Sequence, residues 1–249
     1  MNKLRQRSDS PVKVKLMDTA TATIRKFSIS KARKAQTYLS KKIISEDRLP
    51  EKINLVAGVD IAYADELAIG AVAVLDYESL ELLESQTATC RVKLPYIPTL
   101  LSFREIPPAV ACIRRLKLQP DVFLADGQGV AHPYRCGFAS HLGLVIGKTT
   151  VGVAKSRLIG KPTEIGEDVF LVENGQIIGS VVTTKEDSKP VYVSVGHLIS
   201  LGTAIKIVKH CVRNNRIPEP LLQAHKIASE ERYATPKQWS RKSCSVKPY

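Results

Sequence analysis

The chain has 249 residues and carries 37 Lys+Arg against 24 Asp+Glu, which gives a formal net charge of +13. Hydrophobic residues make up 44% of the sequence, enough for a buried core in one domain or at most two. The longest apolar runs, such as that at 69–75, are far shorter than the roughly 20 residues of a membrane span. No apolar stretch follows the basic N-terminal residues, so we expect neither a membrane protein nor a secretory signal.

The cysteines indicate a reducing compartment. Five of them are dispersed along the chain with no close pair: Cys90, Cys112, Cys136, Cys211 and Cys244. An odd, scattered set favours reduced thiols over a disulfide framework or a zinc ribbon, so we expect a cytoplasmic protein.

The positive charge is concentrated at the two ends of the chain. Residues 1–48 hold 13 Lys+Arg and 4 Asp+Glu, and residues 226–249 hold 6 and 2. The body at 49–225 carries 18 of each and is formally neutral. Basic ends on a neutral body are typical of a protein that meets a polyanion, above all nucleic acid. A basic surface that serves only solubility explains the charge equally well.

The first predicted elements are a helix and a meander. Residues 1–28 are polar and basic without periodicity, so we expect a disordered tail. Apolar residues at helical spacing predict a helix over 30–47, with Ser30 as N-cap and Leu49-Pro50 as its end. Three β-rich runs separated by short polar turns follow at 53–63, 68–77 and 80–92. Such short connections predict an antiparallel meander.

The second part of the chain alternates between helical and strand patterns. A helix is predicted over 102–118, with Pro107 and Pro108 in its first turn, where a missing N–H costs little. Helices are also predicted at 134–146, 200–212 and 220–231. Strands are predicted at 121–126, 149–154, 169–172, 177–184 and 191–195. Asn174-Gly175 suits a type I′ hairpin turn. The order predicts an α/β fold with a mixed sheet, in which parallel strands follow the antiparallel meander and helices flank the sheet.

Two aspartates in apolar strands suggest a metal site. Asp60 lies inside the run 55–62, and Asp126 ends the run 122–125. A buried carboxylate must be paired, protonated or bound to a metal. If the helix between the two strands is a right-handed crossover, the strands are parallel and both carboxylates face one crevice. The pair then suits Mg²⁺, with Mn²⁺ as a substitute, although either aspartate alone is better explained as a turn or cap residue.

Three further residues lie within reach of the same crevice. Glu105 starts the crossover helix, where it either complements the helix dipole or serves as a third metal carboxylate. His132 follows Asp126 across a glycine-rich turn. Lys155 ends the strand 149–154, as a solvated strand terminus or as a charge that balances a phosphate or a leaving oxygen.

A series of segments resembles the endonuclease V family, in the family's order and over roughly 31–231. These segments are Gly58-Val-Asp60, Pro95-Tyr-Ile-Pro98 with Leu101-Ser-Phe-Arg-Glu105, Asp126-Gly-Gln-Gly-Val-Ala-His-Pro133, Ala139-Ser-His-Leu-Gly143, Gly152-Val-Ala-Lys-Ser-Arg-Leu158, Gly196-His-Leu-Ile-Ser200 and Arg216-Ile-Pro-Glu-Pro220. The resemblance implies a ribonuclease H-like catalytic domain at 29–231 between basic tails at 1–28 and 232–249. It also implies Mg²⁺-dependent hydrolysis, in DNA, of the second phosphodiester 3′ to a deaminated adenine (inosine), leaving a 3′-hydroxyl and a 5′-phosphate.

The resemblance also implies roles for individual residues. Asp60 and Asp126 would be the principal metal ligands and Glu105 their acidic partner, while Lys155 and His132 would support catalysis. His225 matches a position near the metal in the family, although a solvated helix residue explains it as well. A second set resembles the base-recognition elements: Tyr96 as a wedge between Pro95 and Pro98, and the main chain around Leu101, Gly127 and Phe138 as the hypoxanthine pocket.

One position departs from the family, and two functions stay open beside DNA repair. Thr99 stands where the family has Gly, which restricts φ and adds bulk beside the pocket. The sequence does not choose between DNA with deaminated bases and inosine-containing RNA as substrate. A catalytically silent nucleic-acid-binding module is the alternative from another class, but the acidic set together with Lys155 speaks against it.

Overall fold

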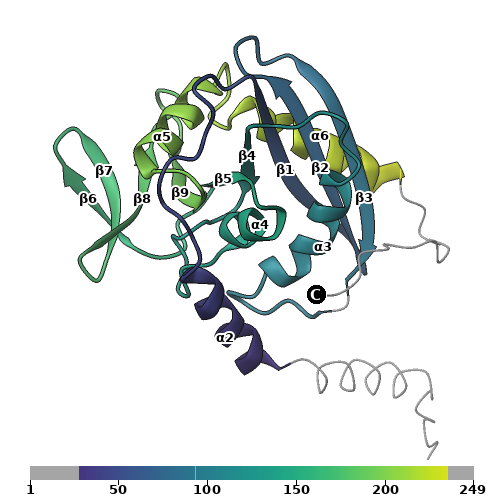
Figure 1. The fold of residues 1–249 in the computed structure, drawn as a ribbon, viewed down its shortest axis with the longest axis horizontal. Helices are drawn as coiled ribbons and strands as arrows, with labels where there is room; N and C mark the ends of the chain where they lie inside the picture. Colours follow the sequence, from purple (N-terminus) through teal and green to yellow (C-terminus); the bar gives the residue numbers. More distant parts are fainter. Residues whose placement is uncertain (1–27, 93, 235–249) are drawn as a thin grey trace, which may run out of the picture.

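The computed structural model describes residues 28–92 and 94–234 (Figure 1). The predicted tails at 1–28 and 232–249 therefore lie outside the described residues, apart from Ser28 and the last three residues of the final helix. The helices are α2 (Ile29–Ser40), α3 (Ser102–Ile113), α4 (Phe138–Ile146), α5 (Leu201–His210) and α6 (Glu219–Ala234). Every helix in the described ranges is too short or too polar to cross a lipid bilayer.

A nine-stranded mixed sheet forms the centre of the fold, in the order β3-β2-β1-β4-β5-β9-β8-β7-β6. The strands are β1 (Leu55–Ala64), β2 (Leu67–Asp76), β3 (Leu82–Arg91), β4 (Val122–Asp126), β5 (Thr149–Ala154), β6 (Lys161–Ile165), β7 (Asp168–Glu173), β8 (Gln176–Val182) and β9 (Val191–His197). The meander β1-β2-β3 is antiparallel, whereas β4 lies parallel to both β1 and β5. The predicted α/β class and mixed sheet are confirmed.

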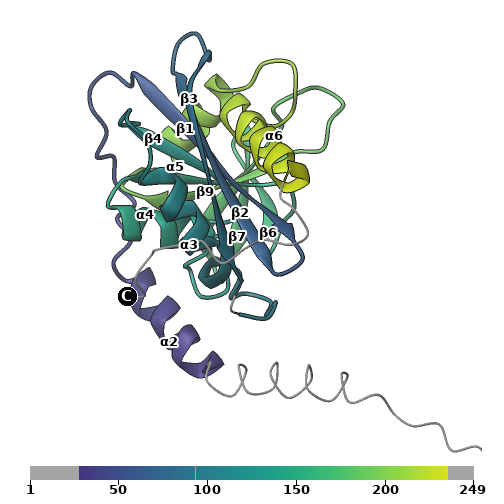
Figure 2. The ribbon, with the colours of Figure 1, turned by 90° about the vertical axis from the view of Figure 1, so that its right-hand side faces the viewer.

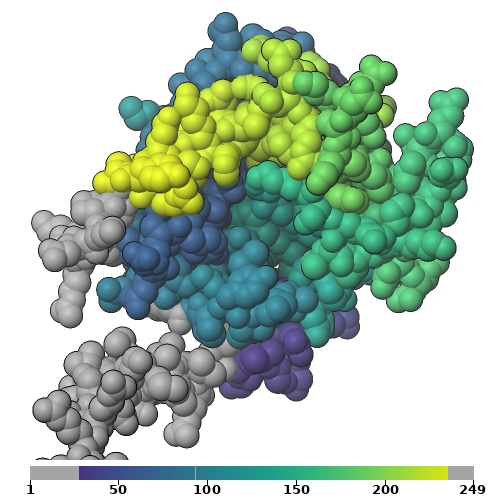
Figure 3. Space-filling view, turned by 180° about the vertical axis from the view of Figure 1, so that it is seen from behind, coloured from purple at the N-terminus to yellow at the C-terminus, as the bar shows by residue number. Residues whose placement is uncertain are grey.

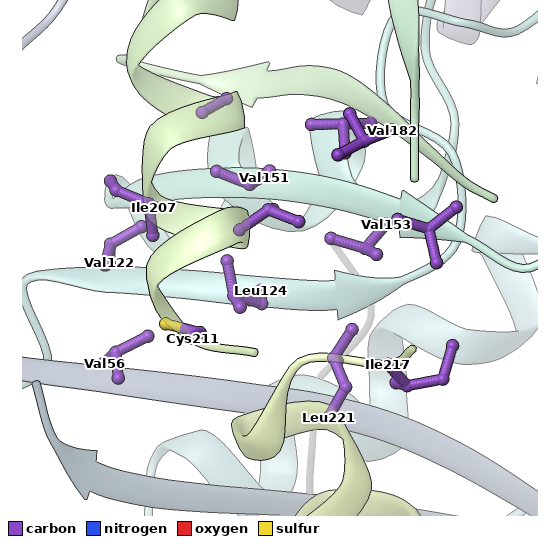
Figure 4. Close-up of a cluster of buried hydrophobic side chains, with 14 of the residues drawn as sticks. Val56, Val122, Leu124, Val151, Val153, Val182, Ile207, Cys211, Ile217 and Leu221 are labelled. Atoms are coloured by element: carbon purple, nitrogen blue, oxygen red, sulfur yellow. The ribbon is translucent and has the colours of Figure 1, made fainter. Parts of the chain in front are cut away.

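Alternate residues of the central strands enter two hydrophobic cores. Val56 and Leu124 belong to the core that α5 and α6 cover, and Figure 4 shows both of them among the side chains of this core, together with Leu221 of α6. Their neighbours Ala57 and Phe123 belong to the core under α3 and α4. Figure 2 shows the same division, with α6 on one side of the strands and α3 and α4 on the other. Because both faces are covered, the central strands read as near-continuous apolar runs.

Two glycines let helices approach this sheet closely. A Cβ added at Gly58 of β1 would lie 1.9 Å from the carbonyl oxygen of Pro220 in α6. On β2, a Cβ at Gly70 would lie 2.5 Å from the carbonyl oxygen of Pro108 in α3. Figure 3 shows α6, in yellow, lying directly on the strands. The absence of side chains at these positions therefore sets the height of two helices above the sheet.

We expect Gly58→Ala to destabilise the protein by about 3 kcal/mol or more, because overpacking against a backbone carbonyl forces α6 away from β1. Urea denaturation measures the change. Gly202→Ala in α5 is the matched control, since its added Cβ meets no atom within 4 Å. That substitution should stabilise the helix by roughly 0.5–1 kcal/mol. A Gly58→Ala midpoint equal to that of the wild type would contradict the tight contact.

The first helix ends earlier than predicted. It was expected over 30–47 with Ser30 as cap, but α2 ends at Ser40 and its N-cap is Ser28. The chain beyond it leaves the helix because the N–H of Ile44 donates to His197 Nδ1 at 3.2 Å, and the carbonyl of Ile44 accepts from Leu198 at 2.8 Å. Hydrogen bonds to His197 and Leu198 thus take the place of the intrahelical hydrogen bonds that a longer helix would make.

Two other helix predictions need correction. α3 ends at Ile113, not at 118, and Pro107 and Pro108 are its sixth and seventh residues, so they do not lie in its first turn. The start at 102 agrees with the prediction, and with that start residues 107 and 108 fall in the second turn. α4 was predicted from 134 but begins at Phe138, because the N–H of Gly137 is bonded to the carbonyl of Gly129 in the preceding loop.

The outer part of the sheet confirms one expectation and adds a strand. Asn174 and Gly175 both have positive φ, 51° and 74°, as a type I′ turn requires. β6 was not predicted, since Lys-Pro-Thr-Glu-Ile lacks an apolar alternation. It is an edge strand that pairs only with β7, and an edge tolerates Pro162. In Figure 1 this hairpin extends away from the body.

The cysteines follow the expectation only in part. Cys112, Cys136 and Cys211 carry free thiols and are buried, and burial raises the pKa of each thiol to about 12. Cys90 is disulfide-bonded, so the expectation of a fully reduced set is wrong at that position.

Candidate functional site

Asp60 and Asp126 lie side by side on parallel strands. Val59 of β1 is paired with Ala125 of β4, so the next residue on each strand is an aspartate. The predicted adjacency is confirmed, with one difference. Asp126 ends β4, whereas β1 continues past Asp60 to Ala64 because β2 prolongs the ladder. Asp60 is only 8% exposed.

Each aspartate has a cationic or donor partner. Lys155, directly after β5, donates a short hydrogen bond from Nζ to Oδ2 of Asp126. His225 of α6 donates from Nδ1 to Oδ2 of Asp60 at 2.7 Å. The other oxygen of Asp60 accepts from the N–H of Ile61 at 2.8 Å. The structure therefore brings the predicted Lys155 and His225 into direct contact with the aspartate pair.

Glu105 completes an acidic cluster from the side of α3. It is 8% exposed, and burial raises the pKa of its carboxyl to about 8, with the negative charges of Asp60 and Asp126 as further causes. Arg104 offsets part of this rise. Burial and the charge of Asp60 also raise the pKa of Asp126, against the opposite effect of Lys155. Three carboxyl groups thus share a site in which the nearby positive charge is too small to compensate all three when they are ionised.

The donor chemistry of this cluster fits a hard divalent cation. Oxygen ligands from Asp60, Asp126 and Glu105 are those that Mg²⁺ and Mn²⁺ prefer, and a bound cation would relieve the repulsion that raises two of the pKa values. Among the described residues, no group of three or more His, Cys, Asp or Glu has its side chains already gathered around one point. Lys155 and His225 instead hold one oxygen of each aspartate.

The predicted wedge lies on a loop between β3 and α3. Tyr96 is 67% exposed, and the flanking Pro95 and Pro98 are exposed as well. Thr99 has φ +71°, in the left-handed region that favours glycine. The backbone at position 99 therefore suits the Gly that the resembling family has there. This chain instead holds a β-branched residue at that position.

The predicted pocket residues come from three neighbouring segments. Leu101 precedes the first residue of α3, Gly127 follows β4, and Phe138 is the first residue of α4. A Cβ at Gly127 would lie 3.3 Å from the Cβ of Phe138, so these two residues are in contact. Phe138 is buried, while Leu101 and Gly127 are partly exposed.

His132 is placed against the wedge loop. It is 5% exposed, and burial lowers the pKa of its imidazole to about 4. Its Nδ1 accepts from the N–H of Tyr134 at 3.2 Å, and an interaction with the main chain of Thr99 offsets part of the fall in its pKa. Within the described residues, none of its hydrogen bonds goes to Asp60, Asp126 or Glu105. The predicted catalytic role of His132 stays a prediction.

Two residues beside the site escaped the sequence reasoning. Arg104 places its guanidinium 4.9 Å from the ring centroid of Tyr63, and its charge acts on Glu105. In the sequence, the available signal for Arg104 was its position directly before Glu105. Gln36 of α2 is fully buried and bonds to the wedge loop. Its signal was a polar residue on the apolar face of a predicted helix.

Fold and site together define a class. A mixed sheet in which an antiparallel meander is followed by parallel strands, with two adjacent aspartates on the central pair, is a ribonuclease H-like fold with an acidic site. Solved structures agree. The endonuclease V from Streptomyces avermitilis matches with a TM-score of 0.77 at 35% identity, covering 84% of this chain and 95% of that one.

The chain belongs to the endonuclease V family, and so to the nucleases. The family model "Endonuclease V" matches residues 37–226. The endonuclease V of Rippkaea orientalis is 47% identical over 210 residues, which cover 82% of this chain and 91% of that protein. A structure of Ciona intestinalis endonuclease V, in complex with a 24mer DNA containing an inosine followed by a ribo-adenosine, matches with a TM-score of 0.74 at 33% identity. It covers 83% of this chain and 98% of that one.

Proposed function

We propose that this protein is a Mg²⁺-dependent endonuclease that hydrolyses the second phosphodiester 3′ to deoxyinosine in DNA and so initiates repair in the cytoplasm. The products would carry a 3′-hydroxyl and a 5′-phosphate. The observation that carries the proposal is the adjacency of Asp60 and Asp126 on two parallel strands, with Lys155 bonded to Asp126 and with Glu105 near enough for the three charges to interact. The Ciona relative's complex with inosine-containing DNA supports the choice of substrate.

The metal would be held by Asp60 and Asp126, with Glu105 as the third carboxylate. When bound, Mg²⁺ supplies Lewis-acid polarisation of the phosphate and a water of lowered pKa. The protein's own groups complete the site. Lys155 is hydrogen-bonded to Asp126, and from this position its ammonium can balance charge on the phosphate or on the leaving oxygen. His225 orients Asp60 through the 2.7 Å hydrogen bond between them.

Recognition of the lesion is assigned to the exposed loop 95–101. A base must leave the stack before it can be read, and a stiff aromatic loop can fill the gap. Tyr96 is exposed and flanked by two prolines, as this role requires. The extruded base would meet the main chain around Leu101, Gly127 and Phe138.

Tyr96→Ala should weaken the selection of inosine in duplex DNA, because it removes a stacking contact worth roughly 1–3 kcal/mol. The maximal rate on a single-stranded inosine substrate should change much less, since no proposed metal ligand is removed. Cleavage kinetics on the two substrates measure the difference. Tyr233→Ala is the matched control, because Tyr233 is 80% exposed at the end of α6 and lies outside the loop. Equal duplex kinetics for Tyr96→Ala and the wild type would rule out the wedge.

Inosine-containing RNA is the second candidate substrate. One observation favours testing it, since the nucleic acid in the Ciona complex carries a ribo-adenosine after the inosine. Cleavage of matched DNA and RNA strands, each with one inosine, should be compared in Mg²⁺ and in EDTA. Faster cleavage of DNA supports the proposal, and faster cleavage of RNA replaces it with the ribonuclease. Binding without cleavage of either strand would indicate a silent binding module.

A further inference from the structure

A buried glutamine connects the N-terminal helix to two loops of the site. Gln36 of α2 has no exposed surface. Its Nε2 donates to the carbonyl of Thr99 at 2.8 Å and to the carbonyl of Cys136 at 3.1 Å. Thr99 belongs to the wedge loop 95–101, and Cys136 to the loop 127–137 that follows Asp126. One side-chain amide therefore joins the two loops from which the base pocket is built.

His132 interacts with the same residue from the loop 127–137. Its Nδ1 accepts from the N–H of Tyr134, which leaves the proton of the neutral ring on Nε2. The ring interacts with the main chain of Thr99, and this interaction offsets part of the fall in the pKa of the imidazole. Thr99 thus has partners both in α2 and in the loop that follows the proposed metal ligand.

The hydrogen bond from Gln36 and the interaction with His132 surround a residue in an unfavourable conformation. Thr99 has φ +71°, which a β-branched side chain rarely adopts. Such a conformation persists only where the surroundings over-determine it. Without these partners, Thr99 is lower in free energy at negative φ than at positive φ. A change to negative φ would move the loop that carries Tyr96.

We propose that Gln36, together with His132, is a positioning residue for base recognition, which makes α2 part of the recognition machinery. The two side chains clamp the main chain of Thr99 and so keep the wedge loop 95–101 in register with the loop 127–137. This inference rests on the proposed function for its consequence in catalysis, but the clamp itself is a property of the free protein. The two are therefore tested separately.

The clamp is tested first, by amide hydrogen exchange in the free protein. Gln36→Met keeps nearly the same volume but cannot donate to either carbonyl. We expect exchange in 95–101 to become at least tenfold faster, since two hydrogen bonds of ordinary strength are lost. Exchange in β1 should stay as in the wild type. Thr37→Ala is the control, because Thr37 is exposed on the same helix and its hydroxyl bonds only to Arg33 within α2. Wild-type exchange in 95–101 would overturn the clamp.

His132 provides an independent pair of variants. His132→Leu removes the donor, and His132→Gln restores an amide N–H. We expect fast exchange in 95–101 for the first variant and a return toward wild type for the second. Gln36→Met could loosen the whole fold, which would appear as faster exchange in β1. In that case the two His132 variants decide whether the clamp exists. A uniform effect of Gln36→Met together with no effect of His132→Leu would show that both residues are only core packing.

The consequence for recognition is tested by kinetics on inosine-containing DNA. Gln36→Met should raise the enzyme concentration that gives half-maximal single-turnover cleavage by about tenfold, because the loop is no longer pre-organised. The rate at saturating enzyme should stay within about threefold, since the carboxylates and Lys155 are untouched. A fall in the saturating rate alone would overturn the positioning role. If the wild type fails to cleave inosine DNA, the proposed function fails, and the exchange result still decides the clamp.

Discussion

Asp126→Asn is expected to lower cleavage of an inosine-containing strand by about 10³-fold or more, with little loss of binding. The substitution keeps the size of the side chain but removes one charge from the aspartate pair that would hold Mg²⁺. Loss of metal-assisted charge stabilisation is worth several kcal/mol, and each 1.36 kcal/mol is about a factor of ten in rate. Single-turnover cleavage at saturating enzyme, beside a binding assay on the same strand, measures both quantities.

The control for this result is an aspartate remote from the cluster. Asp168 is exposed on β7, so Asp168→Asn makes the same chemical change without touching the site. We expect it to cleave at the wild-type rate. Cleavage by Asp126→Asn within a few-fold of the wild type in Mg²⁺ would show that the metal assignment is wrong. Loss of cleavage in both variants would point to a general sensitivity to charge.

With metal removed, Glu105 is expected to make a contribution to stability that is lost as pH rises. The pKa of Glu105 is about 8 in the folded protein, above its ordinary value of 4.5, because burial and two neighbouring carboxylates disfavour its charge. Between these values the folded state holds a proton that the unfolded chain has lost. Glu105 should therefore contribute a fall of roughly 1 kcal/mol per pH unit to the free energy of unfolding in EDTA in that window. Urea denaturation of the wild type and of Glu105→Gln at pH 5.5 and 7.5 measures this contribution as the difference between the two slopes, because the lowered pKa values of the buried His132 and His141 act in the opposite direction.

Added Mg²⁺ should oppose this loss. A cation that binds the ionised carboxylates stabilises the folded state by mass action, and it competes with fewer protons at higher pH. The stabilisation by Mg²⁺ should therefore be larger at pH 7.5 than at pH 5.5. Glu105→Gln should remove the contribution of Glu105 to the slope in EDTA, because the titrating group is gone. A Mg²⁺ effect that is equal at both pH values and unchanged in Glu105→Gln would place the cation away from Glu105.

Local pattern was sufficient to predict the strands that carry the aspartates. The runs around Asp60 and Asp126 are apolar because both faces of the central sheet are covered, and this makes them easy to identify. A crossover helix between the two strands would make them parallel, and the metal-site hypothesis applied if they were also neighbours. The register between Val59 and Ala125 shows that they are parallel and adjacent. The hypothesis of a metal site itself needed only residue type and strand order.

Element ends depended on contacts that the local sequence does not contain. The helix predicted to 47 stops at Ser40 because Ile44 finds its partners at His197 and Leu198, about 150 positions away. The strand β6 forms because β7 offers it a ladder, although its own composition is polar. In both cases a distant backbone partner outweighs the local preference.

The sequence by itself determined the fold class and the two aspartates, because these depend on periodicity, strand order and residue type, and its ordered motifs carried the resemblance to the family. Only the tertiary structure decided which groups act on these aspartates and which act on the loop beside them. His225 meets Asp60 across 165 positions, and Gln36 meets Thr99 across 63. His132 is near Asp126 in sequence but is turned toward Thr99. Such contacts follow from how helices pack on the sheet, where side chains without local periodicity find the partners that burial requires.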